Sequence, residues 1–200
     1  MADGVVPERA RALIDFWFGP PGDPDREQHR QIWFKSTPDH DDTLRRLFLA
    51  DYERAASGAL DAWEAAPESA LALVLLLDQL PRNIFRGDKR TYATDPAARA
   101  VADRALARGF EAAVPPVWSK FFYMPLHHSE DLADQRRVAA LAASMPDDRA
   151  PEERGGNRRY GMPYPDVIEL FGRFPHRNAI LGRPSTPEEI AFMKEVREPG

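Results

Sequence analysis

The longest uninterrupted apolar stretch of the chain runs from Ala70 to Leu77, and a densely polar segment follows it directly. An apolar run of this length with polar flanks is typical of a helix that is buried on nearly all sides. We predict that this central helix begins at Pro67, since proline is favoured in the first turn of a helix. Pro81 is predicted to end it, because proline lacks an N–H and clashes with the preceding turn.

Elsewhere, apolar residues recur at helical spacing, without the alternation of apolar and polar residues that marks a strand. We therefore predict an all-α fold, a single domain over residues 1–200 in which about nine helices stack pairwise, as helical-repeat proteins do. One helix should start at Asp95 with its carboxylate as the cap, and another with a capping box between Thr186 and Glu189. Residues 146–165 are rich in proline, glycine and arginine, which indicates an irregular loop excursion.

The composition argues against several classes of function. A net charge of −5 is unusual for a nucleic-acid-binding protein, which normally has a basic face. The absence of cysteine excludes disulfides, thiolate metal sites and cysteine nucleophiles. The apolar stretch is far shorter than the ~20 residues that span a bilayer, and charged residues occupy the N-terminal region where an export signal needs an apolar core. We expect a cytoplasmic protein that binds neither membranes nor nucleic acid.

One short phrase occurs twice in the sequence. Residues 80–87 and 174–183 follow the same order: a helix end, a proline, an Arg-Asn pair, apolar residues and a glycine. A guanidinium offers five donors in a planar fork that suits carboxylates and phosphates. Arg82 and Arg177 could therefore bind an anion or assist catalysis, or they could pair with carboxylates of the chain and tie helices together. The candidate partners are Asp78, Glu130 and Asp131.

A second concentration of candidate chemistry lies in the segment HHSEDLADQ. On one helix, His127 or His128 would share a face with Asp131. Imidazole beside carboxylate suits a divalent metal or a general base oriented by an acid, and capping with ion pairing is a third interpretation. The spacing does not match a zinc motif such as H-E-x-x-H, so no metal site is assigned. Ser129 is a plausible N-cap for a helix that reaches Met145.

Four motifs in order resemble those of a known family: LLLDQLPRNIFRG, Thr94-Asp95, HHSEDLADQ, and FGRFPHRNAILGR followed by STPEEIAF. The opening IDFWFG and the pair Trp33-Phe34 are similar to its pattern too. Together they resemble the bacterial domain-of-unknown-function family numbered 924 over nearly the whole chain. The resemblance implies a tetratricopeptide-like helical fold and brings no established activity. His127 departs from the pattern, in which we expect glutamate or methionine.

The polar positions that match these motifs are the candidate site residues. They are Asp78, Gln79, Arg82, Asn83, Arg86, His128, Ser129, Glu130, Asp131, Gln135, Arg173, His176, Arg177 and Asn178. The first hypothesis for them is a helical-repeat binding module with a pocket for an anionic small molecule or an acidic peptide. The residues assigned to ligand binding are Asp78, Gln79, Arg82, Asn83, Arg86, Arg173, His176, Arg177 and Asn178.

Two other hypotheses use the same residues differently. In a hydrolase-like enzyme, His128 is the general base, and Glu130 or Asp131 orients its imidazole. Arg82 or Arg177 then stabilises negative charge on the substrate. In a purely structural protein, these groups form one satisfied buried ion network within a protein-interaction scaffold. The sequence assigns no metal and no cofactor, and it leaves the oligomeric state open.

Overall fold

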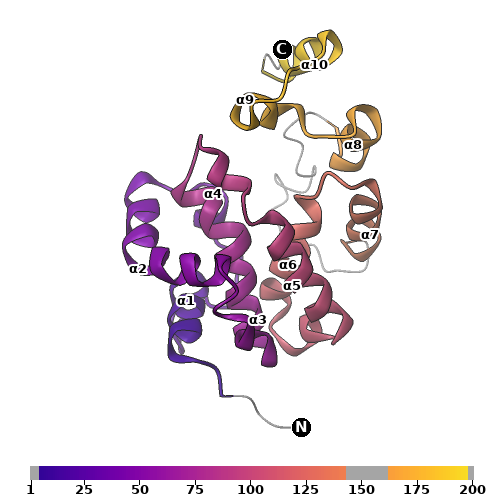
Figure 1. Ribbon diagram of the computed structural model, residues 1–200. Helices are drawn as coiled ribbons and strands as arrows, with labels where there is room; N and C mark the ends of the chain where they lie inside the picture. Colours follow the sequence, from indigo (N-terminus) through magenta and orange to yellow (C-terminus); the bar gives the residue numbers. More distant parts are fainter. Residues whose placement is uncertain (1–4, 143–161, 198–200) are drawn as a thin grey trace. The chain divides into compact units, whose positions relative to one another are not determined.

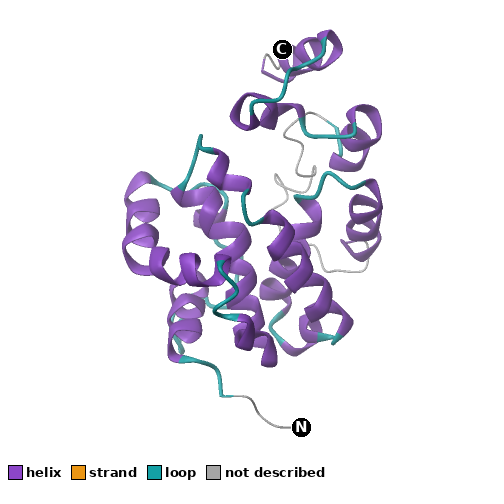
Figure 2. Cartoon of the chain, in the orientation of Figure 1, coloured by secondary structure: helices purple, strands orange, loops and turns teal. Residues whose placement is uncertain are grey.

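A computed structural model describes residues 5–142 and 162–197 of the chain. All regular structure in these ranges is helical, without a strand, as Figure 2 shows, and this confirms the all-α prediction. None of the described helices combines the length and the apolar character needed to cross a bilayer. The chain divides into two compact units, residues 1–125 and 126–200, and each is described by itself. A single domain over 1–200 stays a prediction.

Unit 1 is built around its middle helices. Its α-helices are α1 (Glu8–Phe18), α2 (Pro38–Ala56), α3 (Pro67–Val74), α4 (Leu80–Ile84), α5 (Asp95–Ala107) and α6 (Pro116–His127), the last of which ends in unit 2. Helix α3 packs against α1 and α5, and α4 packs against α2, so α3 and α4 run through the middle of the unit (Figure 1). Short 3₁₀ turns connect the helices at Gln31–Trp33, Asp61–Ala65, Lys89–Tyr92 and Phe110–Ala113.

The apolar stretch forms the core of unit 1 as predicted. Every residue from Ala70 to Leu77 is buried. Aromatic residues close the core around it: the ring of Phe18 stacks on Trp118 with centroids 4.4 Å apart and meets Phe121 edge-on at 5.5 Å. Burial of large aromatic and aliphatic side chains is the main favourable term in folding, so this core holds the unit together.

The central helix does not end at Pro81, and that prediction was wrong. A π-helical segment, Leu75–Gln79, joins α3 to α4, and the helix continues through Pro81 to Ile84. In an α-helix the N–H of residue 81 would pair with the carbonyl of Leu77, which proline cannot do. The Thr94 hydroxyl donates to that carbonyl instead, at 2.6 Å, so the wider turn and an outside donor accommodate the proline.

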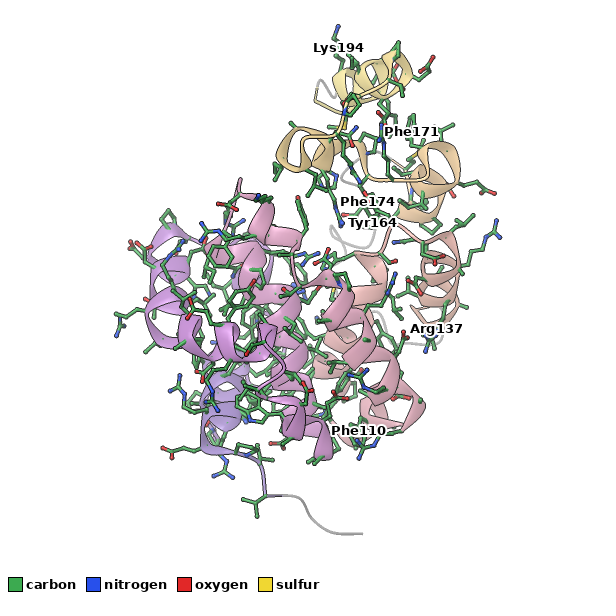
Figure 3. All side chains as sticks on the ribbon, viewed as in Figure 1. Phe110, Arg137, Tyr164, Phe171, Phe174 and Lys194 are labelled. Carbon is green, nitrogen blue, oxygen red and sulfur yellow. The ribbon has the colours of Figure 1, made fainter. Side chains whose placement is uncertain are left out.

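The described part of unit 2 contains the end of α6 and four further helices. These are α7 (Leu132–Ala142), α8 (Tyr164–Phe171), α9 (Asn178–Leu181) and α10 (Pro187–Arg197), with a 3₁₀ turn at Pro175–Arg177. Val167, Ile168 and Phe174 form a small buried apolar cluster in this unit, and Tyr164 meets Phe174 edge-on with centroids 5.2 Å apart (Figure 3). Most of the predicted loop 146–165 lies outside the described residues, but its last two positions already belong to α8.

The helix starts in unit 2 confirm one capping prediction and correct another. Thr186 and Glu189 form the predicted capping box, with each side chain accepting from the backbone N–H of the other at 3.2 and 2.8 Å. Helix α7 starts later than predicted, and its cap is Asp131, whose carboxylate accepts from the N–H of Ala133 at 2.8 Å. The Ser129 hydroxyl donates to Asp134 at 2.6 Å and accepts from the backbone N–H of Asp131 at 3.1 Å, before the helix begins. The predicted end of this helix, at residue 145, lies outside the described ranges.

Candidate functional site

Arg82 lies between two carboxylates in unit 1. Its two Nη atoms donate to both oxygens of Asp95 at 2.8 and 3.0 Å, and Nη1 also lies 3.2 Å from an oxygen of Asp78. The Asp78 side chain is fully buried, and that of Arg82 is 17% exposed. Burial lowers the pKa of Arg82, but the two carboxylates more than compensate, so its pKa lies above the ordinary value. Arg82 thus pairs with carboxylates of the chain, and Asp78 is one of the partners named from the sequence.

The start of α5 completes this network and corrects the predicted cap. Helix α5 begins at Asp95 itself, and Thr94 before it makes no side-chain capping bond. Both side chains are turned to the central helix: Thr94 donates to the Leu77 carbonyl, and Asp95 accepts from Arg82. These two contacts fix the start of α5 against the central helix.

Gln79 belongs to the same cluster. Its Nε2 donates to an oxygen of Asp78 at 2.5 Å, and its side chain is buried. Asp78, Gln79, Arg82 and Asp95 thus satisfy one another as one hydrogen-bonded network. A buried network of this kind rigidifies a core, so the structural interpretation fits this part of the predicted site.

A pocket of about 500 Å³ opens between the start of α2 and α4. It is lined by Ser36, Pro38, Asp41, Asp42, Arg45, Asn83, Ile84 and Arg86. Two of the residues predicted to bind ligand, Asn83 and Arg86, are among them, whereas Asp78, Gln79 and Arg82 are not. In the first copy of the repeated phrase, Arg82 therefore belongs to a closed network, whereas Asn83 and Arg86 line an open pocket.

Arg86 is held at the pocket by one side of its guanidinium. Its Nε donates to Asp41 at 2.9 Å, and the other oxygen of Asp41 accepts from the Ser36 hydroxyl at 2.6 Å. The Arg86 side chain is 56% exposed, and its Nη atoms form no hydrogen bond with any residue that the structure describes. The outer edge of the guanidinium is thus oriented by Asp41 and available to a ligand.

Arg45 contributes a second guanidinium from α2. One of its Nη atoms donates to the carbonyl of Ile84, and the guanidinium carbon lies 5.8 Å from the centre of the Phe85 ring. These contacts hold the side chain across the end of α4 while the residue stays exposed. Arg45 from α2 and Arg86 from the turn after α4 therefore line the same pocket.

Asn83 carries an unsatisfied donor in the pocket wall. Its residue is 8% exposed, and Nδ2 is enclosed without a hydrogen-bond partner among the described residues. Leaving a buried donor unpaired costs about 1–3 kcal/mol, so such groups are uncommon in native proteins.

In unit 2, both carboxylate oxygens of Glu130 accept hydrogen bonds from neighbouring residues. Its oxygens accept from both Nη atoms of Arg183 at 2.7 and 3.0 Å and from the N–H of Phe174 at 2.7 Å. Desolvation raises the pKa of this carboxyl, but the hydrogen bonds from Arg183 and Phe174 and the charge of Arg177 outweigh it, so the pKa lies below the ordinary value. Glu130 joins the start of α7 to the turn before α9.

Glu189 is the centre of a second ion network in unit 2. Arg173 donates to its two oxygens at 2.6 and 2.9 Å, and Asn178 donates to one of them at 3.0 Å. The hydrogen bond from Arg173 is the main reason why the pKa of this carboxyl is lowered, against the opposing effect of burial. Arg173 and Asn178 were assigned to ligand binding, and the structure places both in contacts that hold α10.

The groups proposed for catalysis are not arranged on one helix. His127 ends α6 and Asp131 caps α7, so the helical spacing assumed between them does not apply. The oxygens of Glu130 and one oxygen of Asp131 accept from other groups. The role of His128 as a base therefore stays a prediction.

Arg177 and His176 lie around the Phe174 ring. Arg177 donates to the carbonyl of His128 at 2.8 Å, and its guanidinium carbon lies 4.8 Å from the centre of that ring. The His176 ring centroid is 5.8 Å from that of Phe174. Arg177 therefore joins the end of α6 to the turn at Pro175–Arg177.

Gln135 was matched only by the family pattern, and the structure gives it a clear function. Its side chain is fully buried, and Nε2 donates to the carbonyls of Leu126, His127 and Ser129 at 2.7 to 3.2 Å. The last carbonyls of a helix have no partner within it, so Gln135 caps the C-terminus of α6 from α7. In the described ranges no group of His, Asp and Glu side chains is suited to hold a metal ion.

The sequence analysis missed the residues that complete these clusters. They are Ser36, Asp41, Asp42, Arg45, Arg183 and Glu189 as an ion-pair partner. Arg183 lies inside the second repeated phrase and could have been noted from its position there. The pocket residues on α2 carry no local signal, because they look like the solvated face of an amphipathic helix.

Comparisons with known proteins agree with this fold and assign no activity. The profile of a family described as "Bacterial protein of unknown function (DUF924)" matches residues 13–197. Among solved structures, the protein of unknown function ATU0120 from Agrobacterium tumefaciens is similar, with 40% sequence identity and a TM-score of 0.76. That match covers 93% of this chain and 97% of the other. None of the curated proteins matches this chain.

Proposed function

The chain belongs to this family of bacterial proteins of unknown function, and we propose that it is a binding protein. Its site is the pocket between the start of α2 and α4, and its ligand is an anionic small molecule or the acidic end of a peptide. The observation that carries this proposal is the pair of guanidiniums, Arg45 and Arg86, that line one open pocket.

The geometry of Arg86 supports this use of the pocket. A guanidinium that is held by its Nε and exposed at its outer edge has lost much of its freedom before a ligand arrives, so less entropy is lost on binding. Asp41 provides that restraint. The outer edge can then donate two parallel hydrogen bonds to a carboxylate, which is the strongest geometry for this pair.

The size of the pocket fits a small ligand. Pockets for small molecules typically measure about 300–1,000 Å³ and combine apolar walls with a few polar groups. This one measures about 500 Å³, with apolar contact from Pro38 and Ile84. A tetratricopeptide-like stacking of the helices is part of the same proposal, since helical repeats form extended binding surfaces. A cytoplasmic location is proposed with it.

The test is a binding measurement with charge variants. Purified protein is screened by thermal shift against succinate, citrate and a short peptide ending in glutamates, and each hit is measured by isothermal titration calorimetry. Hydrogen bonds to charged groups contribute about 1.5–3 kcal/mol, so Arg86→Ala or Arg45→Ala should weaken binding by about tenfold or more. The matched control is Arg46→Ala, an exposed arginine next to Arg45 on α2 that does not line the pocket.

The outcomes separate the proposal from its rivals. Loss of binding in folded Arg86→Ala and Arg45→Ala, with full binding in Arg46→Ala, supports the pocket. Binding that survives both pocket variants, or a complete absence of anion binding, overturns it. The closed network around Arg82 is then the only well-defined feature of the repeated phrase in unit 1, and it favours a scaffold.

A further inference from the structure

The charged residues that line the pocket are balanced in number. Arg45 and Arg86 contribute two positive charges, and Asp41 and Asp42 contribute two negative charges. A ligand with only negative charge would meet two carboxylates together with the two guanidiniums, which reduces its gain in electrostatic energy. A ligand with charges of both signs can place each charge beside its opposite.

The two carboxylates differ in what they already bind. Asp41 uses both oxygens within the chain, for the Ser36 hydroxyl and for Nε of Arg86. Asp42 is exposed, and its side chain makes no hydrogen bond or ion pair with the part of the chain that the structure describes. Asp42 is therefore the pocket carboxylate that can take up a cationic group.

The fold places this carboxylate next to the guanidiniums. Asp42 and Arg45 are three residues apart on α2, so they share a face of that helix, and both line the pocket. Arg86 follows α4 and is tied to α2 through Asp41. Asp42 and the two arginines thus border the same opening, together with Asp41 and Asn83.

We propose that the ligand is a small zwitterion of the amino-acid type. Its carboxylate is bound by Arg45 and Arg86, and its ammonium group is bound by Asp42. This inference rests on the proposed function, because it concerns the same pocket, and it adds the requirement for a positive charge. The apolar contact available to the rest of the ligand comes from Pro38 and Ile84.

The experiment compares amino acids with analogues that lack one charge. The twenty standard amino acids are screened by thermal shift at millimolar concentration with the full chain. Each hit is then measured by calorimetry beside its deamino acid and its amide, for example alanine beside propionate and alaninamide. The variants are Asp42→Asn and, as a matched control, Asp39→Asn, which removes an exposed carboxylate from the same helix outside the pocket.

The expected result is a dependence on both charges. The amino acid should bind about tenfold or more tightly than either analogue, since a hydrogen bond to a charged group is lost with each. Asp42→Asn should abolish the advantage over the deamino acid without weakening the deamino acid itself, and Asp39→Asn should change neither. The inference is supported if this preference disappears in Asp42→Asn and persists in Asp39→Asn.

Three other results would overturn it. The deamino acid could bind as tightly as the amino acid, the preference could survive Asp42→Asn, or no amino acid could bind. In each case the anion pocket itself is judged separately by succinate, citrate and the acidic peptide. Binding of those anions that needs Arg86 would leave the proposed function standing while the zwitterion is rejected.

Discussion

At the scale of single residues, two arginines that look alike in the sequence differ in how deeply they are buried. Arg82 and Arg86 are four residues apart in the same phrase, yet the first is enclosed by Asp78 and Asp95 and the second is 56% exposed beside Asp41. Removing one partner of a buried ion pair leaves an uncompensated charge and lowers stability strongly, whereas an exposed pair contributes little to stability. The two arginines therefore have different expected effects when they are removed.

Arg82→Ala should lower the free energy of unfolding by about 3–5 kcal/mol, because it leaves the enclosed carboxylate of Asp78 without its guanidinium. Arg86→Ala, the matched control, should change it by less than about 1 kcal/mol. Urea denaturation followed by circular dichroism measures both, as shifts of the midpoint at constant slope. Equal midpoints for the two variants would mean that the enclosed network does not stabilise the fold.

At the scale of elements, the central helix is maintained across a proline by a wider turn and an outside hydroxyl. The N–H of Leu80 donates to the carbonyl of Leu75, five residues back, which opens the turn before Pro81. The Leu77 carbonyl then accepts from Thr94. The π-helical turn also carries Asp78, so the distortion of the helix and the ion network form one feature.

Thr94→Val should lower the stability by about 1–3 kcal/mol, because the hydroxyl is lost while the Leu77 carbonyl stays buried. Pro81→Ala supplies a backbone N–H that can take over this acceptor. In the Pro81→Ala background, the cost of Thr94→Val should therefore shrink. A double-mutant cycle of urea denaturation measures this coupling, and additive effects would show that hydroxyl and proline act independently.

The sequence predicts the helices well because helical periodicity and capping boxes are local signals. The burial of 70–77 and the capping box at Thr186 follow from a few neighbouring residues. The continuation of the helix through Pro81 depends on Thr94, which is remote in the sequence. Local rules therefore placed the helix end too early.

The candidate site was harder to predict than the fold for a similar reason. Asn83 and Arg86 were identified from the repeated phrase, but their partners in the pocket come from α2, where Asp42 and Arg45 resemble any solvated helix face. Contacts between side chains on different helices leave no recognisable pattern in a single sequence. The same holds for Glu189, which was predicted as a capping residue and is also the ion partner of Arg173.

At the scale of the whole molecule, the two units depend on different interactions. Unit 1 contains a large apolar core with many aromatic side chains, in addition to the enclosed ion network of Asp78, Arg82 and Asp95. The described apolar cluster of unit 2 consists of Val167, Ile168 and Phe174 with partly buried neighbours. Its helices are joined in addition by the carboxylates of Glu130 and Glu189. Because its described apolar cluster is much smaller than the core of unit 1, unit 2 depends more on such charged contacts and should be the more sensitive of the two to acid.

The direction of this pH dependence follows from the two carboxyl groups. The pKa of Glu130 and that of Glu189 both lie below the ordinary value of 4.5 in the folded protein, because arginines and backbone N–H groups stabilise the charged forms. The unfolded chain consequently binds more protons than the folded one between the folded pKa and 4.5. The stability that these groups contribute is present above pH 4.5 and is lost as the pH falls through their folded pKa values.

Two natural probes can test where acid acts first. All 4 tryptophans, at positions 17, 33, 63 and 118, lie in unit 1, whereas helical circular dichroism reports on both units. In moderate urea, acidification below pH 4.5 should therefore reduce the dichroism before tryptophan fluorescence changes. Glu189→Gln removes one titrating group, so it should lower stability at pH 7 and weaken the acid dependence of the dichroism. Coincident transitions by the two probes in the wild type would contradict a preferential acid sensitivity of unit 2.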